Sequence, residues 1–216
     1  MKYVLLDLDG TLTASDEGII KSVQYALEHF GIIENDYEKL KVFIGPPLRE
    51  GFPKYSKLNQ EQTEEAIKLY RERYSVKGLY ENRLYDGVKD MLSACKDKGY
   101  ELVLATSKPR IYAHKIIEHF DIAKYFTYVV GCELDGTLDS KKEIIEYAMK
   151  KCAGADKNDY IMVGDRFYDA EGAKAMGIRS IGVLYGYGSE EELVNAGSTY
   201  ICKTVEELKK LLLNLD

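Results

Sequence analysis

The chain begins with Tyr3-Val4-Leu5-Leu6-Asp7-Leu8-Asp9-Gly10-Thr11-Leu12, in which a short apolar run meets two carboxylates. Four consecutive apolar residues are typical of a buried strand in a parallel sheet. Asp7 and Asp9 follow at its carboxyl end, where open α/β sheets bind their ligands. Because Asp is rare in strands and costly to bury unpaired, the two acids predict a cation or other bonding partners. Taken alone, Asp9-Gly10 is also compatible with an ordinary turn.

Composition excludes several classes of protein. The 216 residues are 45% hydrophobic and 31% charged, and the net charge of −6 argues against a nucleic-acid partner. No apolar run is long enough to span a membrane or to form a signal peptide, so we expect a cytoplasmic protein. We also expect a monomer or a weak homodimer. The four cysteines are scattered without metal-ligand spacing, and the three histidines accompany no nucleophile motif.

Hydrophobic periodicity divides the chain into two domains. Residues 15–81 show helical patterns throughout and predict a small all-helical domain. The rest, residues 1–14 and 82–216, alternates strands with helices and predicts an α/β core with a doubly wound parallel sheet. Its strands are expected at residues 3–6, 101–105, 128–130, 160–163, 180–183 and 200–201.

Polar residues recur where these strands end. Thr106-Ser107 follow the second strand, Lys141 begins a helix, and Asp165 and Asp169 follow the fourth strand. Because parallel strands end at one edge, these groups should converge with Asp7 and Asp9. Clustered carboxylates require a cation, and hard oxygen ligands favour Mg²⁺. Each group also has an ordinary interpretation: a helix N-cap for Thr106-Ser107, a surface lysine for Lys141, and turn or helix acids for the two Asp residues.

A second copy of Leu-Asp-Gly-Thr-Leu occurs at Leu134–Leu138. It has Glu133 where the first copy has Asp7, and its preceding strand is short. Asp135-Gly136 is therefore interpreted as a turn that leads to the Ser140 helix cap, where Glu143 completes a capping box.

Four motifs together resemble those of the haloacid dehalogenase superfamily of phosphohydrolases: Asp7-x-Asp9-Gly10-Thr11, Thr106-Ser107, Lys141, and Gly164-Asp165-x-x-x-Asp169. The likeness spans essentially the whole chain and implies that residues 15–81 are a type-one helical cap. Gly45-Pro46-Pro47-Leu48, Thr106-Ser107-Lys108-Pro109 and Ile181–Gly188 resemble the phosphoglycolate phosphatase-like branch.

The resemblance also implies roles for individual residues. Asp7 would be the nucleophile, Asp9 the proton donor and then the general base, and Lys141 a catalytic charge. Thr106 and the amide of Ser107 would bind the substrate phosphate. Mg²⁺ would be held by the Asp7 carboxylate, the Asp9 backbone carbonyl, Asp165 and Asp169. Close relatives often carry Lys-Pro at this motif, whereas this chain has Ser140-Lys141-Lys142-Glu143. Lys142 is therefore an alternative to Lys141 for the motif lysine.

The implied activity is Mg²⁺-dependent hydrolysis of a small phosphate monoester, such as a phosphoglycolate-like compound, a nucleoside monophosphate or a sugar phosphate. Arg49 and Lys108 are the candidate specificity contacts beyond the phosphate. Two alternatives remain: a phosphomutase of the same superfamily, and a receiver-like signalling domain. In a receiver the phospho-acceptor Asp ends the third strand and no helical domain interrupts the chain.

Overall fold

The computed structural model describes residues 1–152 and 156–215. It contains two compact units: a core unit, Met1–Thr13 with Leu84–Asp216, and a helical unit, Ala14–Arg83. The sequence analysis placed the two domain boundaries after residues 14 and 81. In the structure, the boundaries between the two compact units fall after Thr13 and after Arg83. Two short strands, β2 (Thr13–Ala14) and β3 (Arg83–Leu84), lie at these boundaries and form a two-stranded sheet.

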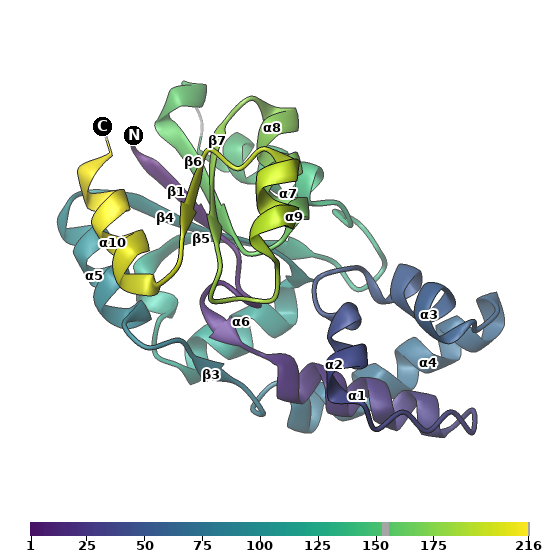
Figure 1. Cartoon of the computed structure of the whole chain (residues 1–216). Coiled ribbons are helices and arrows are strands. Elements are labelled where there is room, and N and C mark those ends of the chain that lie inside the picture. The colour runs from purple at the N-terminus through teal and green to yellow at the C-terminus, as the bar shows by residue number, and fades with distance from the viewer. Residues whose placement is uncertain (153–155, 216) are drawn as a thin grey trace. The chain divides into compact units, whose positions relative to one another are not determined.

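The core unit is built on a six-stranded parallel sheet with the order β5-β4-β1-β6-β7-β8 (Figure 1). Its strands are β1 (Tyr3–Leu6), β4 (Glu101–Pro109), β5 (Phe126–Cys132), β6 (Tyr160–Gly164), β7 (Arg179–Val183) and β8 (Tyr200–Cys202). The N-terminal strand is therefore central, with β4 and β6 on its two sides. The predicted doubly wound parallel fold is confirmed.

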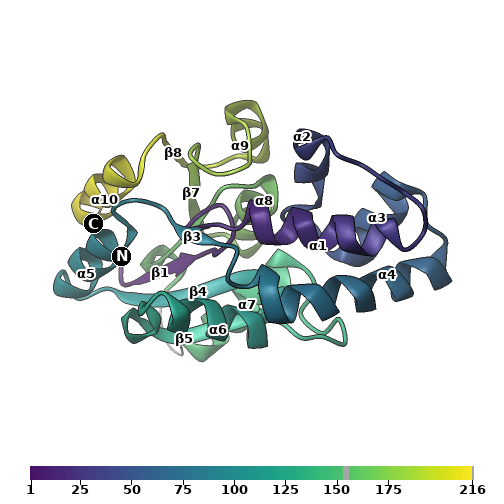
Figure 2. The same ribbon diagram turned by 90° about the horizontal axis from the view of Figure 1, so that it is seen from below.

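Helices cover both faces of this sheet (Figures 1 and 2). The helices α5 (Val88–Asp97), α6 (Arg110–His119) and α10 (Val205–Asn214) lie on one face, and α7 (Lys141–Lys151) and α8 (Phe167–Met176) lie on the other. This division follows from right-handed crossovers, because the chain reverses its direction across the sheet after β5. A further helix, α9 (Glu190–Ala196), packs beside α8 and was not predicted.

Alternate side chains of β1 point to opposite faces and are almost fully buried. Tyr3 and Leu5 join the cluster under α7 and α8, where the Tyr3 ring stacks on that of Tyr160 at a centroid distance of 5.0 Å. Each fully buried large apolar side chain contributes roughly 1.5–3 kcal/mol to stability. The strand that carries the first motif is thus fixed within the hydrophobic core.

The helical unit consists of α1 (Asp16–Glu28), α2 (Tyr37–Leu40), a 3₁₀ turn (Lys41–Phe43), α3 (Leu48–Ser56), α4 (Gln60–Arg73) and a π-helix (Tyr74–Gly78). Residues 15–82, all of which the structure describes, contain no strand, as predicted. Asn59 caps α4 through a reciprocal capping box with Gln62. A Cβ on Gly18 of α1 would lie 2.0 Å from the Gly78 carbonyl, so glycine there permits close helix contact.

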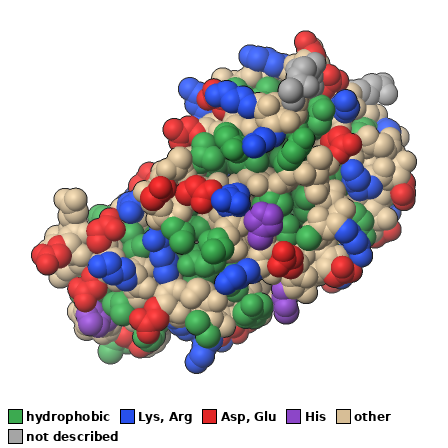
Figure 3. Space-filling model, turned by 180° about the vertical axis from the view of Figure 1, so that it is seen from behind, with side chains coloured by type: hydrophobic (Ala, Val, Ile, Leu, Met, Phe, Trp, Pro, Cys, Tyr) green, Lys and Arg blue, Asp and Glu red, His purple; other side chains and the backbone are tan. Residues whose placement is uncertain are grey.

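In the face shown in Figure 3, lysine and arginine side chains are interspersed with aspartate and glutamate side chains and with apolar patches. Charges of opposite sign therefore offset one another across this face. Among the described residues, no helix combines the length and apolar character needed to cross a bilayer.

Candidate active site

Asp7 lies at the carboxyl end of the central strand. The register pairs Leu6 with Leu104 of β4 and with Val163 of β6, so Asp7 is flanked by the ends of both neighbouring strands. Its backbone N–H donates to the Val163 carbonyl at 3.0 Å, and the residue is 8% exposed. The first motif is therefore held in place by the backbone hydrogen bonds of the sheet. It lies at the edge where parallel sheets bind their ligands.

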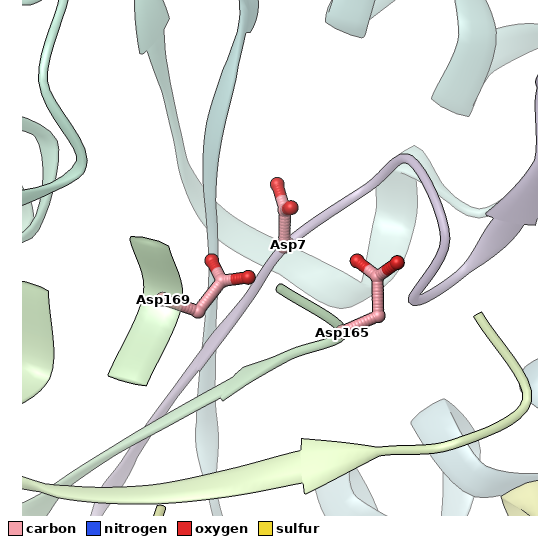
Figure 4. Close-up of side chains that lie close together, drawn as sticks. All are labelled: Asp7, Asp165 and Asp169. Carbon is pink, nitrogen blue, oxygen red and sulfur yellow. The ribbon is translucent and has the colours of Figure 1, made fainter. Parts of the chain in front are cut away.

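Two further carboxylates converge on Asp7 (Figure 4). Asp165 follows β6, and Asp169 lies in the first turn of α8. Each of the three residues is buried and offers an oxygen, and these oxygens all lie within 4.8 Å of one another. The predicted convergence of Asp7, Asp165 and Asp169 is therefore observed.

Lys141 supplies a positive charge between two of the acids. Its Nζ lies 3.0 Å from Asp7 Oδ1 and 2.8 Å from Asp169 Oδ1, and it donates to the Ala105 carbonyl at 3.2 Å. Burial would lower the pKa of Lys141, but Asp169 and Asp7 outweigh burial and raise it, so the ammonium stays charged. Its neighbour Lys142 is exposed. Lys141, and not Lys142, is the lysine that meets the carboxylates.

The position of Lys141 follows from the local sequence. Ser140 caps α7: its Oγ accepts from the Glu143 N–H at 3.2 Å, and the Glu143 carboxylate accepts from the Ser140 N–H at 3.2 Å. This capping box was predicted and fixes Lys141 as the first residue of the helix. A Cβ on Gly172 of α8 would lie 3.1 Å from Lys141 Cγ, so glycine there leaves room for the lysine stem.

The electrostatics of the cluster fit a cation. Burial, and then the charges of Asp169 and Asp7, raise the pKa of Asp165 well above its ordinary value. Burial also raises the pKa of Asp169. Within residues 1–152 and 156–215, the buried atoms Asp7 Oδ1 and Asp169 Oδ1 have no hydrogen bond of good geometry, despite their ion-pair distances to Lys141. A hard divalent cation would satisfy such oxygens and relieve the repulsion among the acids.

Glycines enclose Asp165, which the sequence interpretation missed. A Cβ on Gly10 would lie 2.1 Å from Asp165 Oδ2, and Cβ atoms on Gly186 and Gly188 would lie 2.4 Å from its Cβ and 1.9 Å from its carbonyl oxygen. The Tyr187 N–H donates to Asp165 Oδ2 at 2.8 Å. The alternating glycines of Gly186-Tyr187-Gly188 were the available signal, because they let a loop pass close to a strand end.

Thr106 and Ser107 were expected to follow a strand that ends at residue 105, but β4 continues to Pro109, with a register shift between Thr106 and Pro109. Thr106 is buried, and its Oγ1 accepts from the Lys108 N–H at 3.2 Å. The Ser107 carbonyl accepts from Cys132 Sγ at 3.0 Å. Neither Thr106 nor Ser107 caps α6, whose N-cap is Pro109. The interpretation of Thr106-Ser107 as a helix cap is therefore wrong, while phosphate binding there stays a prediction.

The two candidate specificity residues lie in different units. Lys108 is buried in the core unit, where its Nζ lies 2.9 Å from Asp9 Oδ2. Arg49 belongs to α3 of the helical unit, where its Nε lies 3.0 Å from Glu64 Oε1. Asp9 is not one of the three clustered carboxylates. Its predicted metal contact, through the backbone carbonyl, stays a prediction.

The second Leu-Asp-Gly-Thr-Leu copy is a turn, as predicted. Asp135 Oδ1 accepts from the Thr137 N–H at 2.9 Å, and the Glu133 and Thr137 backbones are joined by a 2.8 Å hydrogen bond. Gly136 has φ +94°, which glycine adopts without strain. Turn chemistry accounts for this copy.

Comparison with known proteins identifies the family. The profile of haloacid dehalogenase-like hydrolases matches residues 4–183. A 5'-nucleotidase of Pseudomonas aeruginosa is 43% identical over 209 residues, covering 97% of this chain and 94% of that protein. Tyrosine-protein kinase PtkA of Mycobacterium tuberculosis is 35% identical over 213 residues, covering 98% and 72%. Phosphoglycolate phosphatase 1 of P. aeruginosa is 29% identical over 217 residues, covering 96% and 78%.

A crystal structure of a predicted phosphatase from Clostridium acetobutylicum superposes with a TM-score of 0.95 at 48% identity, covering 99% of each chain. Fold, site and similarity together define a phosphohydrolase with an acidic centre at the edge of a parallel sheet. The chain belongs to the haloacid dehalogenase-like hydrolase family, and within it to the phosphatases. The predicted family and enzyme class are confirmed.

Proposed function

We propose that this enzyme hydrolyses a small phosphate monoester in the presence of Mg²⁺, through an aspartyl-phosphate on Asp7. The proposal rests on one observation above all: three buried carboxylates and Lys141 meet at the carboxyl end of β1. Lys141 keeps the Asp7 carboxylate ionised and oriented at the strand end, and an ionised, positioned carboxylate is a competent nucleophile.

Each step is assigned to a residue of the chain. An Asp7 oxygen attacks phosphorus, the ester bond to the leaving oxygen breaks, and Asp9 gives that oxygen a proton. A water then gives a proton to Asp9 and attacks phosphorus, so the Asp7–phosphorus bond breaks and phosphate leaves. Thr106 and the Ser107 amide hold phosphoryl oxygens, and Lys141 keeps Asp7 oriented and offsets negative charge.

The carboxylates of Asp7, Asp165 and Asp169, with the Asp9 carbonyl, would hold Mg²⁺. When bound, the ion neutralises charge on the transferring phosphoryl group. Lys141 already pairs with Asp7 and Asp169, and the glycines around Asp165 fix its carboxylate in the cluster. The chain therefore organises the ligands through contacts of its own.

The substrate is proposed to be a nucleoside monophosphate, with phosphoglycolate and sugar phosphates as the other members of the class. This order follows the relatives, because the one named 5'-nucleotidase is 43% identical and the one named phosphoglycolate phosphatase is 29% identical. We propose that the helical unit acts as a cap that carries Arg49 to the substrate, in a cytoplasmic enzyme that is monomeric or weakly dimeric.

The acceptor of the phosphoryl group distinguishes this proposal from its rivals. Water is the acceptor in a phosphatase, a second sugar hydroxyl in a phosphomutase, and a tyrosine hydroxyl in the reaction that the name of the mycobacterial relative describes. The assay incubates the enzyme with Mg²⁺ and AMP, phosphoglycolate or glucose 1-phosphate, and measures free phosphate. Formation of an isomeric sugar phosphate without free phosphate would refute hydrolysis.

The residue assignment is tested with Asp7→Asn. This variant should lose phosphate release by at least roughly 10³-fold, because an amide is a poor nucleophile. Asp121→Asn is the matched control, since Asp121 is an exposed surface acid paired with Lys124. Circular dichroism checks that both variants are folded. Retained turnover in Asp7→Asn would show that another group attacks phosphorus.

A further inference from the structure

Lys108 and Asp9 form a buried ion pair that the proposed reaction leaves without a function. Nζ of Lys108 lies 2.9 Å from Oδ2 of Asp9, and the two side chains are 4% and 15% exposed. Oδ1 of the same carboxylate is shielded from solvent and has no hydrogen-bond partner among the residues that the structure describes. The two oxygens of Asp9 therefore have different environments: one is anchored and one is unsatisfied.

The Lys108 side chain projects from a backbone that is fixed on both sides. Its N–H donates to Thr106 Oγ1 at 3.2 Å, which closes a turn at the end of β4. Its carbonyl faces Gly131 of β5 so closely that a Cβ on Gly131 would lie 2.5 Å from it. The Lys108 side chain is thus attached to a rigid strand end. Enzymes hold supporting side chains within a few tenths of an ångström by placing them on such rigid elements.

Asp9 needs such support because its own backbone is part of a turn. Gly10, the next residue, has φ +80°, so the chain leaves the sheet at this point. A carboxylate there rotates about its side-chain bonds, and a buried ion pair restricts that rotation. An unsatisfied buried oxygen costs free energy, so its retention beside an anchored partner oxygen points to use in the reaction.

We propose that Lys108 is a positioning residue: it anchors Asp9 Oδ2 so that Oδ1 is the oxygen that exchanges protons during catalysis. This inference rests on the proposed function and assigns the two oxygens separate roles. In the first step the proton on Oδ1 passes to the leaving oxygen as the Asp7–phosphorus bond forms and the ester bond breaks. In the second step Oδ1 takes a proton from the attacking water as the Asp7–phosphorus bond breaks. Lys108 takes no part in either proton transfer.

The rival interpretation is the one predicted from the sequence, in which Lys108 contacts the substrate beyond its phosphate. The two differ in how the loss of Lys108 depends on the leaving group. A misplaced proton donor harms substrates whose leaving oxygen is strongly basic and needs a proton, and it spares those whose leaving group departs unaided. A lost substrate contact raises KM and does not depend on leaving-group basicity.

The test measures kcat and KM for Lys108→Met with an alkyl phosphate, phenyl phosphate and p-nitrophenyl phosphate. We expect kcat to fall roughly 10²-fold for the alkyl phosphate and less than about 5-fold for p-nitrophenyl phosphate. Lys108→Arg keeps a donor at this position and should recover part of the loss. Lys115→Met is the control, because Lys115 is an exposed lysine of α6 and should match the wild type with every substrate.

A double variant shows whether Lys108 acts through Asp9. In the Asp9→Asn background there is no proton for Lys108 to position, so adding Lys108→Met should change kcat by less than about 2-fold. Two results would overturn the inference. One is an equal loss of kcat for all three substrates, and the other is a double variant whose loss of kcat is the product of the two single-variant losses. If Lys108→Met does not fold, Lys108→Gln, which also removes the charge, replaces it in the single and the double variant. A wild-type enzyme that releases no phosphate refutes the proposed function instead.

Discussion

Gly10→Ala tests whether the glycine enclosure positions Asp165 for the metal. Gly10 has φ +80°, so any side chain there costs about 1–2 kcal/mol of backbone strain. The new Cβ would also lie 2.1 Å from Asp165 Oδ2, whereas ordinary contact begins at 3.4 Å. The difference, 3.4 − 2.1, means that the carboxylate must move by about 1.3 Å.

That displacement exceeds the roughly 0.5 Å within which functional groups must be held. We therefore expect Mg²⁺ affinity to fall about 10–100-fold, the usual effect of disturbing the groups that orient metal ligands. Isothermal titration calorimetry measures the affinity, and urea denaturation measures the free energy of unfolding. One kcal/mol of lost stability corresponds to a Tm lower by about 2–4 °C in a chain of this size.

Gly99→Ala separates strain from displacement. Gly99 has φ +89° in the same unit, but a Cβ there would meet nothing within 4 Å. It should cost the same 1–2 kcal/mol and bind Mg²⁺ as the wild type does. If Gly10→Ala binds Mg²⁺ as tightly as Gly99→Ala, the enclosure does not position Asp165.

Two further predictions concern metal linkage and the second Asp-Gly motif. Because the pKa of Asp165 is raised above 3.8, the metal-free protein retains a proton that Mg²⁺ must displace; this group's contribution to stability falls as pH rises through the raised pKa, and Mg²⁺ restores it. The Tm increase on adding Mg²⁺ should therefore grow as the pH rises through that raised pKa, and a pH-independent increase would contradict this linkage. Asp135→Ala removes the turn hydrogen bond from the Thr137 N–H, so phosphate release should be unchanged and stability should fall by about 0.5–1.5 kcal/mol. A loss of turnover would restore the second copy as a candidate site.

The fold was predictable because its signals are local. The apolar run of β1 and the capping box at Ser140 are each contained in a few consecutive residues. The α9 helix was missed although it also carries local signals: Ser189 accepts from the Glu192 N–H, and Gly197 ends the helix with φ +88°. The second strand was expected to end at residue 105, but β4 continues to Pro109, where Pro is tolerated because the strand ends there.

The site was predictable only in part, for a geometric reason. Convergence of Asp7, Asp165 and Lys141 follows from parallel strands that end at one edge. Pairing of Lys108 with Asp9 does not follow from topology, because a lysine side chain can reach several neighbours and its direction depends on the turn that carries it. The enclosure of Asp165 by Gly186 and Gly188 depends on how a loop returns to the strand end, which spacing alone does not specify.

The central place of β1 has a consequence for biosynthesis. Tyr3–Leu6 leaves the ribosome well before its partners, which are Glu101–Leu104 on one side and Tyr160–Val163 on the other. At about 5–20 residues per second, the strand waits roughly 8–30 s for its second neighbour. The helical unit, Ala14–Arg83, is a compact unit of consecutive residues and can collapse during that interval. The nascent chain thus carries an unpaired, uncharged β-strand during this interval, and chaperone dependence during synthesis should trace to Tyr3–Leu6.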